Sequence, residues 1–242
     1  MIVSTSVSVL TTNKRSKSAV HLLHRFAFMW RFMDNSYKTI KNEAHIEYII
    51  KKSRFIGHIK PVTTQEEALA FIGEISKKYW DATHNVYAYI LRNGGIKRFS
   101  DDGEPQGTAG IPSLDVLEKS GVTDCVVVVT RYFGGVMLGA GGLVRAYSHS
   151  ASLAVTAAEP ITMALCARLK IQCDYNFYGK LASLIPESNG IIEDTVYEDN
   201  VTVIFRLPCS LINSFNAKLI DCSNGKYSAE KTDEFFAETS NL

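Results

Sequence analysis

Alternating apolar and polar residues predict two β-strands between residues 44 and 62. Ile46, Tyr48 and Ile50 alternate with polar neighbours, and a second apolar run covers residues 55–59. A period of two places the apolar side chains of a strand on one face, which the fold then buries. We therefore expect a pair of strands that contribute to a core.

The pattern then changes to the spacing of an amphipathic helix. Thr64 followed three residues later by Glu67 is a capping-box signature of a helix start. The apolar residues that follow share one helical face, and charged residues occupy the other. They are Ala68, Ile72, Ile75 and Tyr79. We expect this helix to lie with its apolar face on the sheet.

Four further elements complete a first domain. They are a hairpin of 86–91 and 96–99 that turns at Asn93-Gly94, a short helix over 112–119 ended by Gly121, an apolar strand over 125–129, and an Ala/Ser-rich helix from about 142 to 158. The strand over 125–129 is apolar throughout, which is typical of a central strand that is covered on both faces.

A second unit follows the break at Glu159-Pro160. We place the domains at 33–160 and 161–242. The second domain is expected to contain a strand over 165–173, a helix from 177 that closes between Pro186 and Gly190, strands over 191–197 and 201–207, a helix marked by Leu211, Phe215 and Leu219, and a short last strand. This βαββαβ order is that of a ferredoxin-like split unit, so the predicted fold class is α+β with two domains.

Composition narrows the function classes. The 242 residues carry 26 Lys+Arg and 25 Asp+Glu, a net charge of +1, which argues against coating nucleic acid by bulk charge. No apolar run approaches the ~18–20 residues of a membrane span. The five cysteines form no C-x-x-C pair, which favours reduced thiols in a cytoplasmic protein over disulfides or a zinc site.

Residues 1–32 form a basic extension that we exclude from the fold. The segment contains five Lys and Arg residues, many Ser and Thr residues and no acidic residue. That composition is typical of an organelle targeting segment. A start codon assigned too early, upstream of Met33, is the favoured alternative, and a disordered extension also stays open.

A polar loop over 100–110 holds the first candidate chemistry. Its carboxylates, Asp101, Asp102 and Glu104, can hold Mg²⁺ with water completing the coordination shell. Asp, Gly and Pro are also the residues of ordinary turns, and this interpretation is favoured because no complete coordination motif is present. Gly107 and Thr108 precede a helix, where backbone N–H groups can bind an anion.

The second candidate is a glycine-rich loop after the apolar strand. Five glycines within nine residues allow the positive φ angles and close backbone approach that a phosphate or RNA backbone needs. Arg131 and Arg145 flank the loop and suit phosphate contacts. The predicted anion- or RNA-binding residues are Arg131, Tyr132, Gly134, Gly135, Gly139, Gly141, Gly142, Arg145, Gly107 and Thr108. A tight strand-to-helix connection is the structural alternative.

His84 is a weaker candidate. It begins a predicted strand and can act as a general base or polar site, although a hydrogen-bonded structural histidine is the favoured interpretation. No local sequence motif identifies a nucleophile together with its general base, so no catalytic residue is assigned.

Several ordered motifs resemble the YigZ/IMPACT family. They are Ser53–Gly57, Ala82–Asn85, Asp101–Pro105 with Gly107–Gly110, Arg131–Gly135, and Gly139 with Gly141–Tyr147. The resemblance covers about 37–160, and the acidic second domain is similar to that of bacterial members. It implies a first domain folded like the second domain of a ribosomal protein and a ferredoxin-like second domain. Eukaryotic relatives regulate translation with an extra N-terminal domain that residues 1–32 do not resemble, so that activity is not carried over.

Three function hypotheses of different classes remain open. The favoured one is a non-catalytic, translation-associated regulator that binds RNA backbone or a ribosomal or translation-factor surface through the glycine loop. The second is a nucleotide- or phosphometabolite-binding enzyme that uses Mg²⁺ at the 101–104 loop. The third is a protein-interaction module in stress regulation, with a regulatory protein as partner. We expect no cofactor apart from Mg²⁺ in the second case, and no membrane partner.

Overall fold

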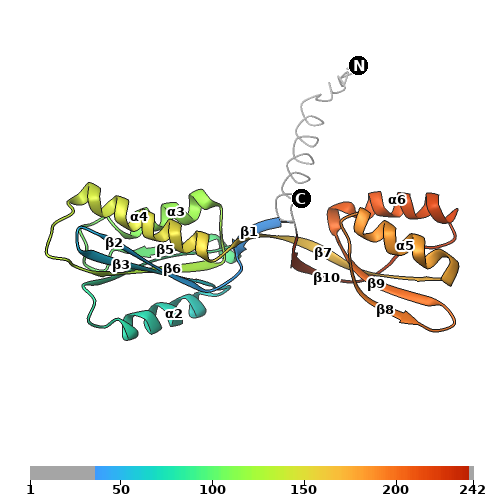
Figure 1. The fold of residues 1–242 in the computed structure, drawn as a ribbon, viewed down its shortest axis with the longest axis horizontal. Coiled ribbons are helices and arrows are strands. Elements are labelled where there is room, and N and C mark those ends of the chain that lie inside the picture. Colours follow the sequence, from blue (N-terminus) through green and yellow to red (C-terminus); the bar gives the residue numbers. More distant parts are fainter. Residues whose placement is uncertain (1–35, 240–242) are drawn as a thin grey trace, which may run out of the picture. The chain divides into compact units, whose positions relative to one another are not determined.

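The computed structural model describes residues 36–239 (Figure 1). The predicted extension over 1–32 lies outside this range. Two five-stranded sheets are present, and each has its own hydrophobic core. The α+β class with two domains is confirmed.

The first sheet has the strand order β2-β3-β6-β4-β5, and all its neighbouring strands are antiparallel. Its strands are β2 (Ala44–Ile50), β3 (Ser53–Pro61), β4 (His84–Leu91), β5 (Ile96–Ser100) and β6 (Cys125–Tyr132). Its helices are α2 (Gln65–Lys78), α3 (Gly110–Ser120) and α4 (Ala140–Ala157), and a 3₁₀ turn η1 (Asn93–Gly95) joins β4 to β5. The predicted strand pair, hairpin and helices of this domain are therefore confirmed.

Helices cover both faces of this sheet, α3 and α4 on one face and α2 on the other (Figure 1). The side chains of the central strand β6 are buried on both of these faces. Val127 and Val129 point into the core beneath α3 and α4, whereas Val126 and Val128 pack with Phe71 of α2. A strand buried on both sides needs apolar residues at every position, which confirms the prediction for 125–129.

The second sheet has the order β1-β7-β9-β8, and β10 also pairs with β7. Its elements are β1 (Ser36–Ile40), β7 (Pro160–Cys173), α5 (Tyr175–Glu187), β8 (Ile191–Tyr197), β9 (Val201–Pro208), a 3₁₀ turn η2 (Cys209–Leu211), α6 (Ile212–Ser223) and β10 (Glu230–Glu238). The predicted βαββαβ order is present. The last strand is longer than expected because its ladder follows β7 from Lys170 to Met163.

No helix within residues 36–239 combines the length and apolar character needed to cross a membrane.

The predicted capping box of α2 is present. Thr64 Oγ1 accepts a hydrogen bond from the Glu67 N–H at 3.2 Å, and Glu67 Oε2 accepts the N–H groups of Thr64 and Thr63 at 3.3 and 2.7 Å. These bonds, led by that from the Thr63 backbone, lower the pKa of Glu67. Backbone N–H groups at the start of the helix thereby find side-chain oxygens as acceptors.

Replacing Thr64 by alanine should lower the free energy of unfolding of the first domain by about 1 kcal/mol, because helix N–H groups lose their acceptor. Urea unfolding followed by circular dichroism measures this loss. Thr64→Ser keeps the hydroxyl and serves as the control. Equal stability of the alanine and serine variants would contradict a stabilising capping box.

Candidate functional site

The Asp101 carboxylate occupies the N-terminus of α3. It accepts hydrogen bonds from the backbone N–H groups of Gly107, Ala109 and Gly110, at 2.8, 3.1 and 2.8 Å. These N–H groups do bind an anion, as the sequence predicts, but the anion belongs to the protein itself. Thr108, also predicted to bind an anion, is buried and donates its hydroxyl to the Pro105 carbonyl at 2.6 Å. Gly107 and Thr108 are therefore structural.

Asp102 fixes the position of His84. The Asn85 N–H donates to Asp102 Oδ2 at 2.6 Å, and the Asp102 carbonyl lies 2.7 Å from His84 Nδ1. Because a carbonyl only accepts, Nδ1 carries the proton of this bond. Gly103, at φ +84°, lies beside the ring, where an added Cβ would be in ordinary van der Waals contact at 3.5 Å. His84 is thus a positioned histidine with its Nε2 directed towards Glu104, at 3.8 Å from Oε1.

Glu104 is the centre of a buried polar cluster. Its Oε1 accepts hydrogen bonds from Arg131 Nη1 at 2.5 Å and from the Tyr147 hydroxyl at 2.8 Å. Glu104 and Arg131 are only 7% and 6% exposed, and Tyr147 is fully buried. Burial, followed by the neighbouring Glu104 carboxylate, raises the pKa of Tyr147 far above its usual value. The Arg131 guanidinium also lies 5.4 Å from the Phe55 ring centre.

These contacts correct two predictions. The carboxylates of Asp101, Asp102 and Glu104 do not point to one shared position, because each has a different protein partner: backbone N–H groups for Asp101, the Asn85 N–H for Asp102 and Arg131 for Glu104. Across the described part of the chain, no group of three or more His, Cys, Asp or Glu side chains is arranged to hold a metal ion. Arg131 is also not a surface contact for RNA, since its charge is buried against Glu104.

The glycine-rich loop joins β6 to α4 and packs on the turn between β2 and β3. The Gly134 N–H donates to Ser53 Oγ at 3.1 Å, and a Cβ on Gly134 would lie 2.0 Å from the Lys52 carbonyl carbon. Only glycine permits such an approach. Gly135 and Gly139 have φ angles of +82° and +72°, so they too need glycine. Gly141 and Gly142 form the first turn of α4.

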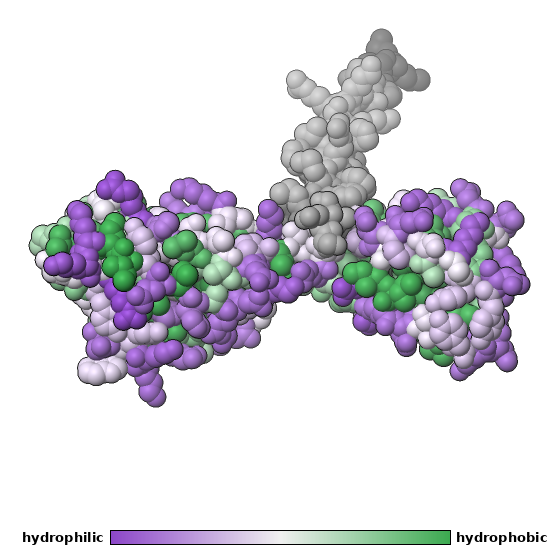
Figure 2. Space-filling model, in the orientation of Figure 1, coloured by the Kyte–Doolittle hydropathy of each residue, from purple (hydrophilic) through white to green (hydrophobic). Residues whose placement is uncertain are grey.

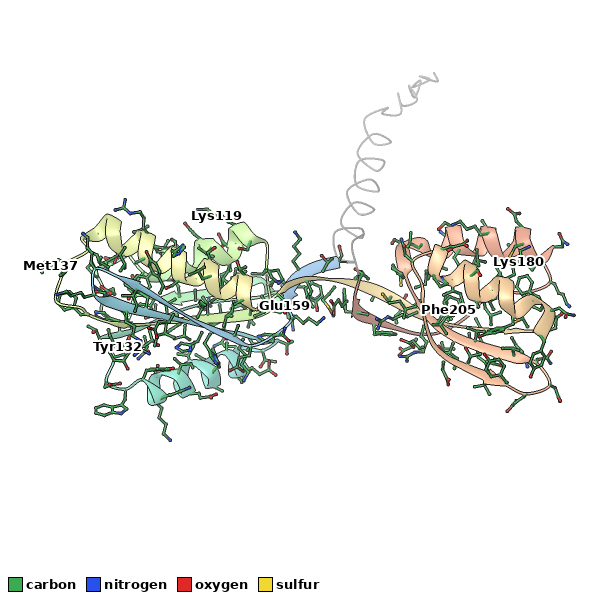
Figure 3. All side chains as sticks on the ribbon, viewed as in Figure 1. Lys119, Tyr132, Met137, Glu159, Lys180 and Phe205 are labelled. Atoms are coloured by element: carbon green, nitrogen blue, oxygen red, sulfur yellow. The ribbon has the colours of Figure 1, made fainter. Side chains whose placement is uncertain are left out.

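The outer part of this loop is exposed and apolar. Phe133, Val136 and Met137 are 48%, 42% and 86% exposed. Figure 3 shows Met137 at the outer tip of the domain, with Tyr132 nearer to α2. In Figure 2 this end of the domain presents green apolar atoms among purple hydrophilic ones. Tyr132 is partly exposed, and its hydroxyl donates to Asp81 at 2.8 Å.

Positive charge surrounds the loop. Arg145 lies exposed on α4, one turn beyond its glycine start. Lys51 and Lys52 form the two-residue turn against which Gly134 packs, and both are exposed. We name Lys51, Lys52, residues 133–142 and Arg145 together the loop surface.

Sequence reasoning missed Lys51, Lys52 and Trp80. The two lysines sit between predicted strands, but only the packing of Gly134 against them, more than eighty positions later in the sequence, associates them with the loop. Trp80 follows the helix face predicted to be apolar, yet it is 82% exposed. A tryptophan two residues after Lys78, just beyond the end of a helix, was the available signal.

Comparison with known proteins places these features in a family. Family models match residues 51–155, as the Impact N-terminal domain, and residues 171–226, as a domain of unknown function, DUF1949. A solved structure described as "Crystal structure of an hypothetical protein" is 32% identical with a TM-score of 0.52, and the match covers 82% of this chain and 98% of that chain.

Two curated relatives match most of the chain. IMPACT family member YvyE of Bacillus subtilis (strain 168) is 40% identical over 195 residues, which cover 80% of this chain and 90% of that protein. IMPACT family member YigZ of Escherichia coli (strain K12) is 36% identical over 179 residues, which cover 73% and 88%. The chain therefore belongs to the IMPACT family.

Proposed function

We propose that this protein is a non-catalytic regulator associated with translation, and that its loop surface binds the phosphate backbone of RNA on the ribosome. Membership of the IMPACT family supports a regulatory role associated with translation or stress in general. The observation that carries the RNA proposal is the group of exposed cations around the glycine loop. Lys51 and Lys52 take the role that the sequence suggests for Arg131, and Arg145 keeps the role that the sequence predicts for it.

These three cations are free to contact an external anion. Within residues 36–239, Lys51, Lys52 and Arg145 form no ion pair, whereas nearby Arg54 pairs with Glu47 at 2.8 Å. Exposed cations of this kind lose little hydration before they meet a phosphate. Contacts between Lys or Arg and phosphates supply most of the sequence-independent affinity of proteins for nucleic acid.

The backbone of the two lysines supports a role for their charge. Lys51 and Lys52 have φ angles of +46° and +63°. In a two-residue hairpin turn with both φ angles positive, Asn and Gly are strongly preferred. Strained non-glycine residues concentrate at functional sites, where the side chain justifies the conformation. We take the lysines at this turn as such a case.

The start of α4 adds a second favourable feature. Its N-cap is Gly139, at φ +72°, and no side chain caps the first turn. Uncapped N–H groups and the positive end of the helix dipole favour phosphate. Arg145 extends from the same helix. Backbone and side-chain donors thus converge on the loop without base-specific groups, as expected for backbone binding.

A protein partner is the second candidate, because Val136 and Met137 are exposed apolar side chains at the loop tip. Apolar side chains of this size are typical anchors in protein interfaces. Binding to such a partner would depend on Met137 and respond weakly to salt, whereas binding to phosphate would depend on the cations and respond strongly.

Replacing Lys51, Lys52 and Arg145 together by glutamine should weaken binding to purified ribosomal RNA and flatten its salt dependence. The slope of log affinity against log salt should fall by about 0.7–0.9 for each phosphate that the variant no longer neutralises. Filter binding over a salt series measures both quantities. Glutamine keeps a polar side chain of moderate length and removes the charge.

The matched control removes the same charge from the second domain, through Lys170→Gln, Lys180→Gln and Lys218→Gln, all exposed positions. The control should keep most of the affinity and slope. If the two triple variants weaken binding and flatten the slope equally, binding follows total charge and the loop surface is not the binding site.

A further inference from the structure

Among residues 36–239, Trp80 is the most exposed aromatic residue. Its side chain is 82% exposed, two residues after the end of α2. Leaving an apolar side chain of this size exposed to water costs free energy, which burying it in the core would avoid. One exposed residue alone carries no argument. Its surroundings, however, show that it belongs to a built surface.

The turn that holds Trp80 is fixed at both ends. The Tyr79 carbonyl accepts hydrogen bonds from the Ala82 N–H at 3.1 Å and from Asn85 Nδ2 at 3.2 Å. The Thr83 N–H donates to the Arg131 carbonyl at 2.9 Å. Trp80 is therefore an exposed ring on an ordered backbone. Such a ring loses little conformational entropy when a ligand stacks on it.

Two further aromatic residues are bound to the same turn. Tyr132 donates its hydroxyl to Asp81 at 2.8 Å, next to Trp80. The Phe133 backbone N–H donates to Thr83 Oγ1 at 3.0 Å, but the Phe133 ring lies 5.6 Å from the Arg131 guanidinium, on the other face of the strand from Tyr132. The end of β6 and the turn after α2 thus hold Tyr132 and Trp80 next to each other through Asp81. We name Trp80 and Tyr132 the aromatic surface.

The charge beside the aromatic surface is mainly positive. Lys77 and Lys78 form the last turn of α2, and Tyr79 separates them from Trp80. The Arg54 guanidinium lies 5.6 Å from the centre of the Tyr132 ring, with Glu47 as its ion-pair partner at 2.8 Å. The nearby carboxylate of Asp81 is engaged with Tyr132. Flat aromatic rings among cations complement a ligand that has flat faces and negative charge.

We propose that the aromatic surface binds an unpaired RNA strand, with a base stacked on Trp80 and the adjacent phosphates near Lys77 and Lys78. This inference rests on the proposed function and specifies its substrate class. Bases offer their faces to side chains only when they are unpaired, so stacking selects single strands over duplexes.

The test uses the full chain with Trp30→Phe, which leaves Trp80 as the single tryptophan, since the sequence has two. A short single-stranded RNA and a duplex of the same sequence are titrated, and tryptophan fluorescence is recorded. We expect quenching and tighter binding with the single strand. Trp80→Ala should weaken single-strand binding by about 5- to 150-fold, the range for removing one stacked base. Trp80→Phe, which keeps an aromatic face, should retain most of the affinity.

Tyr175→Ala removes an aromatic residue of the second domain that is 55% exposed and is the matched control. Unchanged single-strand binding by Trp80→Ala, or equal quenching by duplex and single strand, would overturn the inference. If ribosomal RNA still binds through Lys51, Lys52 and Arg145 in that case, the proposed function stands without it. Single-strand binding that requires Trp80 but not those cations would support the inference and contradict the proposed function.

Discussion

Replacing Glu104 by glutamine should lower the free energy of unfolding of the first domain by about 3–5 kcal/mol, the range for a buried ion pair that loses one partner. Glutamine keeps the volume of the side chain, so packing changes little. The Arg131 charge, 6% exposed, would remain buried without its carboxylate. Urea unfolding followed by circular dichroism measures the loss.

Two further variants isolate the cause. Glu118→Gln removes an exposed carboxylate that pairs with Lys97, and it should cost less than about 1 kcal/mol. The double variant Glu104→Gln with Arg131→Met removes both buried charges and should recover part of the stability. A single Glu104→Gln variant as stable as Glu118→Gln would show that the buried pair does not stabilise the domain.

Acidification should destabilise the first domain through His58. This residue is 2% exposed, and within residues 36–239 its Nε2 has no hydrogen-bond partner. Burial, followed by the charges of His45 and Lys78, lowers its pKa from 6.5 to about 4. Between these pH values the unfolded chain binds the proton and the folded chain does not. The free energy of unfolding should therefore fall as the pH falls through this window, by about 3 kcal/mol in total.

His58→Leu removes this contribution, so its stability should depend less on pH than that of the natural sequence between pH 6.5 and about 4. Several carboxylates titrate in the same pH window, but both proteins contain them. Their contribution to the free energy of unfolding therefore cancels when one urea-unfolding series is subtracted from the other. His149→Gln, at an exposed position of the same domain, is the control and should keep most of the pH dependence. Parallel pH curves for His58→Leu and the natural sequence would contradict a neutral buried His58.

The secondary structure was predictable because its signals are local. The capping box of Thr64 and Glu67 and the apolar run over 125–129 each lie within a few consecutive residues, and the structure contains both features as predicted. Gly121 ends α3 in the left-handed conformation that a C-terminal glycine predicts. The length of β10 was underestimated because its partner β7, not its own sequence, determines where it ends.

The candidate site was less predictable because its contacts are distant in sequence. An arginine beside a glycine loop indicates phosphate binding, but Glu104, 27 positions earlier, neutralises Arg131 in the core. Three carboxylates within four residues suggest a metal, but the fold gives each one a different partner. Of the cations beside the loop, Arg145 was predicted from the sequence, whereas Lys51 and Lys52 come from a turn that no local pattern associates with it.

Co-sedimentation of the full chain with ribosomes over a salt series tests the central claim most directly. We expect the natural sequence to sediment with ribosomes at low salt and to be released as salt rises. The Lys51, Lys52 and Arg145 glutamine variant should stay largely in the supernatant, while the second-domain control should sediment like the natural sequence. Absence of sedimentation at low salt, or equal sedimentation of both triple variants, would contradict binding through the loop surface.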